Sequence, residues 1–322
     1  MQATLSKLVQ DIIEVSWELF KIMIPTLIVV KILTEIGFVS QLDSVCAPLL
    51  SVIGLPANLV VVVTTTMLTN PYAGLIVFSG LPLADDFSVA QASILAIFML
   101  FTHSLPVEVL ISRRAGVRMR IILFARIGGG IIFCAFLNQL FAFTEWLSDP
   151  AFISLPEFVV NDNLFAWGVS QVKGLVMVQL IIIVLLSLLA LLKAIGIEAL
   201  MHRLLTPFLL LLGIGGRAST IAVVGVTLGL GFGGGLLIKE VKSGGIPRSD
   251  VFGVLVFINL FHSVIEDTAV VLLLGPSLIV IVIGRFLFTI LFVWLTMRGV
   301  GILSDRVWRK MLTNRNIPEK AG

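Results

Sequence analysis

Long, uninterrupted runs of apolar residues dominate the chain, and polar residues gather in the segments between them. A transmembrane α-helix requires about 20 consecutive, mostly apolar residues. Transmembrane β-strands would instead appear as short segments in which apolar and polar residues alternate. The continuous runs therefore predict membrane-spanning helices over Trp17–Phe38, Val89–Ile111, Ile121–Phe143, Leu175–Ile195, Phe252–Leu274 and Leu278–Met297.

Two further apolar segments contain helix breakers. Val45–Gly80 includes Pro56 and Asn70-Pro71, and Leu204–Ile238 includes the glycine-rich stretch Gly229–Gly235. Proline and glycine interrupt helices, so each segment predicts a helical hairpin rather than one straight span. The sequence leaves open whether each hairpin is re-entrant or crosses the membrane twice.

The composition agrees with a lipid environment. The mean hydropathy is +1.11, with 58% hydrophobic and 13% charged residues, whereas soluble domains carry about 25% charged residues. The chain is therefore predicted to be all-α, polytopic and embedded in a lipid bilayer. The basic pI near 9.0 does not indicate nucleic-acid binding, because membrane proteins concentrate Lys and Arg in cytoplasmic loops.

An internal repeat organises the pattern. When the chain is shifted by 159 positions, uncommon residues fall into ungapped register. The paired residues are Gly37 with Gly196, Pro48 with Pro207, Gly54 with Gly213, Gly74 with Gly233, His103-Ser104 with His262-Ser263, Gly116 with Gly275 and Arg126 with Arg285. Two of only three histidines pair in this way, so the match indicates two copies of one unit.

Charge predicts the orientation of the copies. The basic segments Arg113–Arg120, Lys239–Arg248 and the tail from Arg298 are expected in the cytoplasm. The segment Thr144–Gln171 contains acidic residues and no Lys or Arg, and Leu81–Phe87 contains Asp85 and Asp86, so both are expected outside. Both termini are then cytoplasmic, provided that each hairpin enters and leaves on the same side.

This topology gives each copy three crossings and one hairpin. Three is an odd number, so the second copy is predicted to be inverted relative to the first, as in many secondary transporters. The predicted organisation is repeat 1 over 1–143 with a hairpin at 45–80, an external connector over 144–172, inverted repeat 2 over 173–298 with a hairpin at 204–238, and a cytoplasmic tail over 299–322.

The chemistry is concentrated in one apolar segment of each repeat. In Phe252–Leu274, Asn259, His262, Ser263 and Glu266 have the spacing of one helix face, and Asp267 adjoins them. Ionisable groups at membrane depth are costly and usually face the bundle interior or a wet path. These residues are therefore candidates for binding a substrate or ion, or for carrying protons.

The equivalent segment of repeat 1 contains Thr102, His103, Ser104 and Glu108. Pseudo-symmetry predicts that the two polar groups face the same central region, although helix capping is an equally simple role for His103 and Glu108. The candidate metal ligands, if a metal is bound, are His103, His262, Glu266 and Asp267.

Both hairpins also carry polar candidates. The candidate substrate-binding residues there are Asn58, Asn70, Arg217, Ser219 and Thr220. Ser and Thr in membrane helices often bond to their own backbone, and Arg217 has an alternative role at the membrane interface. The sequence shows no His-Glu-x-x-His and no Cys-x-x-Cys, so neither an enzymatic role nor a cofactor is expected.

The element order and the segment His262-Ser263-Val264-Ile265-Glu266-Asp267-Thr268 resemble the membrane family with the nucleoside-recognition, or gate, domain. That family includes spore maturation proteins and the membrane part of ferrous iron transporter B, and is related to concentrative nucleoside transporters. The resemblance extends from about Trp17 to Met297. It implies a bacterial cytoplasmic membrane protein with a nucleoside-like ligand. The GTPase domain of the iron transporter is not present in the sequence.

Three functions remain open. The first is a secondary transporter or permease that moves a small polar solute with ion or proton coupling. The second is passage of a divalent metal ion. The third is a non-transporting membrane partner in envelope or spore-type assembly, and a homo-oligomer is possible in each case.

Overall fold

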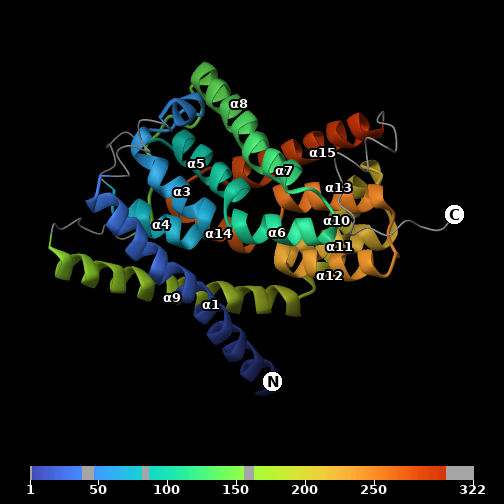
Figure 1. The fold of residues 1–322 in the computed structure, drawn as a ribbon, viewed down its shortest axis with the longest axis horizontal. Coiled ribbons are helices and arrows are strands. Elements are labelled where there is room, and N and C mark those ends of the chain that lie inside the picture. Colours follow the sequence, from blue (N-terminus) through green and yellow to red (C-terminus); the bar gives the residue numbers. More distant parts are fainter. Residues whose placement is uncertain (1, 38–46, 82–86, 156–162, 302–322) are drawn as a thin grey trace. The chain divides into compact units, whose positions relative to one another are not determined.

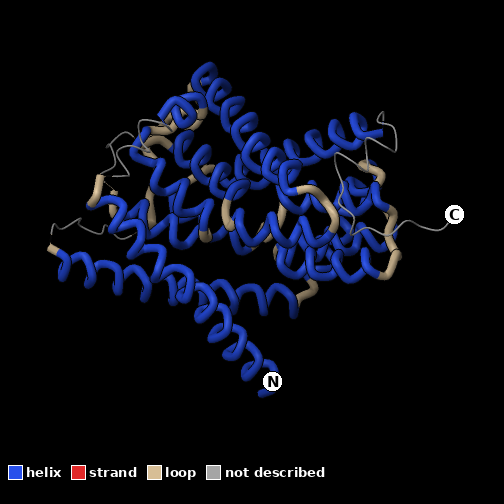
Figure 2. Tube along the Cα trace, in the orientation of Figure 1, coloured by secondary structure: helices blue, strands red, loops and turns tan. Residues whose placement is uncertain are grey.

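The computed structural model describes residues 2–37, 47–81, 87–155 and 163–301. Over these residues the chain is helical and contains no strand, in agreement with the all-α prediction, as Figure 2 shows. Part of the predicted organisation lies outside the described residues. This part comprises Phe38, Val45, Asp85, Asp86, the connector residues 156–162 and the tail from residue 302.

The described residues divide into two compact units that interleave along the chain. Unit 1 comprises Met1–Ser104, Cys134–Ile195 and Ala269–Ser277, and unit 2 comprises Leu105–Phe133, Gly196–Thr268 and Leu278–Gly322. This grouping by contacts differs from the division into sequence repeats, whose bounds stay a prediction.

Unit 1 contains a short helical hairpin and two long helices, labelled in Figure 1. Its elements are α1 (Gln2–Glu35), η1 (Ala57–Leu59), α3 (Val60–Leu68), α4 (Pro71–Ser79), α5 (Val89–Thr102), most of α8 (Gly129–Thr144), α9 (Leu164–Ala194) and η3 (Leu272–Leu274). Helices α3 and α4 form the hairpin, and α3 also packs on α5. The Asn70 side chain caps α4 by accepting the Ala73 N–H at 3.0 Å.

Unit 2 contains the second hairpin. Its elements are α6 (Leu105–Ala115), α7 (Met119–Leu123), the π-helical η2 (Phe124–Gly128), α10 (Ile197–Leu211), α11 (Gly216–Leu228), α12 (Leu230–Lys242), α13 (Arg248–Leu260), the first half of α14 (Glu266–Val271), the π-helical η4 (Val280–Gly284) and α15 (Arg285–Gly301). Helices α11 and α12 form the hairpin. Helix α13 packs against both of them, and α6 packs on α12.

Three continuous helical stretches have the length and composition of membrane spans: Met119–Thr144, Leu164–Leu192 and Val280–Gly299. They coincide with three of the six predicted spans and are the candidate spans among the described residues. Val89–Thr102 and Leu105–Arg114 form a fourth only as a pair bent by 42°. The expected span at Trp17 lies within α1, where Glu18, Lys21 and Lys31 reduce the apolar character, and α1 is not among these stretches.

The prediction of one continuous span over Phe252–Leu274 is wrong. Helix α13 ends at Leu260, and α14 begins only at Glu266. The span over Val89–Ile111 is likewise broken between Thr102 and Leu105. At this break Pro106 has no N–H to donate to the carbonyl of Thr102, which explains the interruption. The apolar character of these segments therefore did not predict the continuity of their helices.

A close backbone contact holds hairpin α11–α12 together. A Cβ atom added to Gly233 would lie 2.6 Å from the Gly225 Cα and 2.9 Å from its nitrogen, whereas one added to Gly235 would meet nothing within 4 Å. We expect Gly233→Ala to lower the free energy of unfolding by about 1–3 kcal/mol, because the helices must separate.

The matched control is Gly235→Ala, which we expect to be neutral or stabilising by up to about 1 kcal/mol through helix propensity. Denaturant titration of the two purified variants in detergent micelles measures both effects. Equal behaviour of the two variants would show that the contact with Gly225 does not limit the packing.

Candidate functional site

The candidate site of unit 2 lies at the break between α13 and α14. Residues Phe261–Ile265 leave the helix, and Ser263 has a positive φ of 44°. The expectation that Asn259, His262, Ser263 and Glu266 share one helix face is therefore wrong, because the helix does not continue through them. The break instead turns His262 and Asp267 out of the regular helical register.

The irregular backbone of this break is supplied with hydrogen-bond partners by its neighbours. The N–H groups of Ser263 and Val264 donate to the carbonyls of Gly225 and Val226 at the end of α11, at 3.4 and 2.9 Å. Non-helical backbone at membrane depth is tolerated only where protein or a wet cavity covers it. The end of hairpin helix α11 provides this cover.

Arg285 donates hydrogen bonds to backbone carbonyls at the end of α13 and within the break. Its side chain is fully buried, its Nε donates to the Leu260 carbonyl at 2.8 Å, and its Nη2 donates to the His262 carbonyl at 3.4 Å. The guanidinium also lies 5.4 Å from the centre of the Phe261 ring. The Arg285 guanidinium therefore caps the C-terminal end of α13, where carbonyls without a partner in the helix favour positive charge.

His262 connects the break to α6. Its side chain is 1% exposed, its Nδ1 lies 2.6 Å from the Ile258 carbonyl, and its Nε2 lies 3.2 Å from Glu108 Oε1. The Glu108 carboxylate also accepts a charge-assisted hydrogen bond from Arg126, which is fully buried within η2. Arg126, Glu108 and His262 thus form one buried chain of polar contacts, which we call the Glu108–His262 network.

A second polar contact fixes α13 against α6. The Asn259 amide is fully buried and donates to Ser112 Oγ at 2.9 Å and to the Leu255 carbonyl at 2.8 Å. Ser112 Oγ in turn donates to the Glu108 carbonyl at 2.9 Å. These bonds position the backbone of Glu108 next to the helix that ends before His262.

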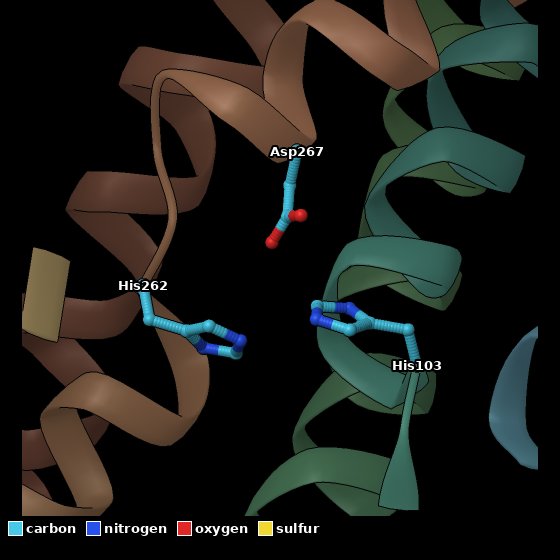
Figure 3. Close-up of side chains that lie close together, drawn as sticks. All are labelled: His103, His262 and Asp267. Carbon is cyan, nitrogen blue, oxygen red and sulfur yellow. The ribbon is translucent and has the colours of Figure 1, made fainter. Parts of the chain in front are cut away.

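Asp267 lies in the first turn of α14 and is 7% exposed. One of its carboxylate oxygens and one ring nitrogen of His262 lie within 4.8 Å of each other. In Figure 3 the carboxylate of Asp267 and the ring of His262 point toward the same space. The figure also labels His103, which belongs to unit 1. Glu266, beside Asp267, is partly exposed.

His103 and Ser104 have a local geometry in unit 1 that parallels His262 and Ser263. His103 Nδ1 lies 3.1 Å from the Met99 carbonyl, and Ser104 has a φ of 52°. The Ser104 N–H donates to the Thr66 carbonyl at 3.2 Å. These contacts correspond, at an offset of 159, to the bonds of His262 to Ile258 and of Ser263 to Gly225.

The remaining candidates lie on other elements, where one is a surface residue and another caps a helix. Arg217 is 75% exposed and pairs with Glu240 at 3.6 Å, because it lies in the first turn of α11 where the side chain reaches the surface. Thr220 is exposed, Ser219 is buried in α11, and Asn58 lies in η1. Asn70 is used as the N-cap of α4.

Sequence reasoning missed Arg126 and Arg285 as site residues, although both belong to the repeat. A signal was available: each is a charged residue inside an apolar segment long enough to span the membrane. Ser112 gave no comparable signal, because a serine close to a basic loop is common in any membrane helix.

Comparison with known proteins supports membrane residence. The uncharacterized membrane protein YvoD of Bacillus subtilis is 29% identical over 265 residues, which cover 81% of this chain and 84% of YvoD. No protein-family model and no solved structure matches the chain. The likeness to YvoD and the apolar helices agree that the chain is a membrane protein.

Proposed function

We propose that the protein is a secondary permease that moves a small polar solute across the membrane with ion or proton coupling. The observation that carries this proposal is the Glu108–His262 network at a helix break in unit 2. Burying Arg126, Glu108 and His262 within apolar helices is expensive, and intramembrane ionisable groups usually serve substrate or ion movement. Broken helices are where secondary transporters bind their substrates.

Inverted-repeat architecture is part of this proposal. Its support is the recurrence of unusual backbone at an offset of 159. Left-handed residues recur in the pairs Gly37 and Gly196, Gly54 and Gly213, Ser104 and Ser263, and Gly116 and Gly275. Non-glycine residues rarely adopt positive φ, so the pair Ser104 and Ser263 is the most specific of these matches.

The hairpins are proposed to be re-entrant. Helices α3 and α4 have 9 residues each, and α11 and α12 have 13 residues each. At 1.5 Å per residue the longer pair reaches about 20 Å, less than the roughly 30 Å of a bilayer core. Each hairpin then enters and leaves on one side, which is the condition that the charge-based topology requires.

The family resemblance suggests the solute class. The segment from His262 to Thr268 resembles the nucleoside-recognition family, so nucleoside-like solutes are the first candidates. The proposed location is the bacterial cytoplasmic membrane with both termini inside. Homo-oligomerisation stays a prediction, as does a non-transporting role in envelope or spore-type assembly.

One observation favours divalent-metal passage as a second candidate function. His262 and Asp267 offer an imidazole nitrogen and a carboxylate oxygen within 4.8 Å of each other. These are ligand types that divalent transition metals accept. Under this alternative, uptake of a divalent metal ion is competed by other divalent ions, and a calorimetric metal-binding signal is lost in Asp267→Asn.

The test of the permease proposal is uptake into proteoliposomes. A thermal-shift screen of the purified protein with nucleosides, divalent metals and organic anions first selects the solute. We then expect His262→Ala to lower the initial rate of uptake at least about tenfold, because it removes a side chain that contacts Glu108.

The matched control is His202→Ala, since His202 is exposed on α10 and receives the same substitution. We expect wild-type uptake from it, and both variants should elute as wild type on size-exclusion chromatography. His103→Ala tests whether the repeat-related histidine contributes equally. An uptake rate of His262→Ala equal to that of the wild type would rule out a role for the Glu108–His262 network. If the wild type takes up no screened class of solute, the non-transporting role in envelope or spore-type assembly is favoured instead.

A further inference from the structure

The directions of the helices in unit 2 decide which of their ends lie together. The Gly215 N–H, just before α11, donates to Asp250 in the first turn of α13 at 3.4 Å. The Ser263 N–H, beyond the end of α13, donates to the Gly225 carbonyl in the last third of α11 at 3.4 Å. Helices α11 and α13 therefore run in the same direction, and α12, the returning arm of the hairpin, runs in the opposite one.

Helix α6 also runs opposite to α13. Its Ser112 accepts a hydrogen bond from Asn259 at 2.9 Å, and its Glu108, one turn earlier, contacts His262, which follows α13. Helices α6 and α12 are therefore parallel, and they pack side by side (Figure 1). Their C-terminal ends lie at the same end of unit 2, where α11 and α13 begin.

Exposed basic side chains gather at this end of unit 2. They are Arg113, Arg114, Arg120, Lys239 and Lys242, and we call them the basic end. Arg113 and Arg114 lie in the last turn of α6, Arg120 lies at the start of α7, and both lysines lie in the last turn of α12. Such a concentration of one sign of charge creates a positive potential that attracts anions.

The acidic residues at the same end do not cancel this charge. Among the described residues of α6, α7, α11, α12 and α13, the acidic residues at this end are Glu240 and Asp250. Glu240 pairs with Arg217 at 3.6 Å, and Asp250 accepts hydrogen bonds from the Gly215 N–H and the Ser249 hydroxyl. Positive charge therefore remains in excess.

The turn that carries the arginines has a fixed backbone. Ala115 and Val117 are fully buried, and Gly116 between them has a positive φ of 117°. The Val117 N–H donates to the Ser112 carbonyl at 3.2 Å, which closes the end of α6. Little backbone order must be gained when a ligand binds to such a turn, and this favours binding.

Exposed apolar side chains lie next to the basic ones on both helices. Leu110 is 40% exposed and precedes Arg113 and Arg114 by three and four residues, so it shares their face of α6. Leu236 is 44% exposed and precedes Lys239 by three residues on α12. Each helix thus presents an apolar side chain one turn away from a cation. A phospholipid matches both features, because it joins a charged phosphate to acyl chains, whereas a free anion matches only the cations.

We infer that the basic end of unit 2 binds the headgroups of anionic phospholipids, with their acyl chains along Leu110 and Leu236. Arginine donates to phosphate oxygens through its planar guanidinium, and lysine acts on them as a point charge. The charge-based topology expects this end in the cytoplasmic leaflet. Binding of this lipid class does not depend on a transport role of the protein.

The experiment is native mass spectrometry of the full-length protein in detergent micelles, titrated with phosphatidylglycerol or with phosphatidylcholine of the same acyl chains. At low ionic strength we expect the wild type to bind phosphatidylglycerol at least about tenfold more tightly than phosphatidylcholine, because each Lys or Arg near the surface attracts anionic lipid. The triple variant Arg114→Gln, Lys239→Gln, Lys242→Gln should lose most of this preference.

Two further triple variants separate local charge from total charge. Lys7→Gln, Lys173→Gln, Arg203→Gln removes as many positive charges from exposed positions on α1, α9 and α10, and should keep the preference. Arg114→Lys, Lys239→Arg, Lys242→Arg retains the charges and should also keep it. All variants should elute as wild type on size-exclusion chromatography.

Three results would overturn the inference. The first is a preference that survives in the glutamine variant of the basic end, or that is lost equally in the Lys7, Lys173 and Arg203 variant. The second is a wild-type preference that does not weaken as salt is raised, since salt screens exposed charges; this measurement needs no variant to fold. The third is an equal rise in the thermal unfolding temperature with inorganic phosphate alone, which would indicate a site for a soluble anion instead of a lipid.

Discussion

Replacing Arg126 with Met is expected to lower the free energy of unfolding by about 3–5 kcal/mol, because it leaves the buried Glu108 carboxylate without the guanidinium that neutralises it. Arg126 is fully buried, and Glu108 is 9% exposed. Water cannot take over the lost contact in such a site. The measurement is equilibrium unfolding of the purified protein by SDS titration in mixed micelles, with the helical signal followed by circular dichroism.

A second substitution separates the charge effect from packing. In the double variant Arg126→Met with Glu108→Gln, no uncompensated charge remains, so we expect most of the lost stability to return. Arg120→Met is the matched control, because Arg120 is exposed in the neighbouring α7 and should change stability by less than about 0.5 kcal/mol. Equal losses in the single and double variants would show that the Arg126 side chain acts through packing alone.

The helices that the sequence predicted well are those whose apolar runs end at polar loops. Segments Ile121–Phe143, Leu175–Ile195 and Leu278–Met297 each correspond to a continuous helical stretch with the length and composition of a span. Hydropathy identifies such runs directly, because lipid favours apolar side chains on a helix that bonds its own backbone. The same measure says nothing about hydrogen bonding inside the bundle, which is why both broken segments were expected to be continuous.

The two breaks differ in how visible they are in the sequence. At the break between Thr102 and Leu105, Pro106 is a local signal, since proline is tolerated in the first turn of a helix but interrupts a helix that would continue through it. At the second break no proline occurs between Phe261 and Ile265. There the interruption depends on partners distant in sequence, namely the carbonyls of α11 and the guanidinium of Arg285. A local pattern does not encode such partners.

The same limit applies to the site. His262, Asp267 and Glu108 were all predicted as candidates, because charge inside apolar segments is rare and costly. Their pairing was not predicted, since Glu108 and His262 are 154 residues apart, with Glu108 on α6 and His262 in the break after α13. Arg217 was singled out by the same rule and proved to be exposed, because the rule identifies an apolar neighbourhood and not the direction of a side chain.

Replacing Arg285 with Met is expected to destabilise the protein by about 3 kcal/mol or more, because two buried carbonyls lose their donor and the buried carboxylate of Asp267 loses a nearby cation. Arg285 donates to Leu260 and His262 across the break, and each unsatisfied buried acceptor costs about 1–3 kcal/mol. Arg285→Lys separates geometry from charge. Lysine keeps the positive charge, but its single ammonium on a flexible side chain does not reproduce the planar guanidinium that donates to both carbonyls. We therefore expect a loss of stability smaller than that of Arg285→Met.

Arg298→Met, at the exposed end of the same helix, is the matched control and should be nearly neutral. Hydrogen exchange resolves the mechanism: amides of Phe261–Ile265 should lose protection in Arg285→Met before the rest of α13 does. If protection falls uniformly across unit 2, or if Arg285→Lys is as damaging as Arg285→Met, the side chain does not act by closing the end of α13.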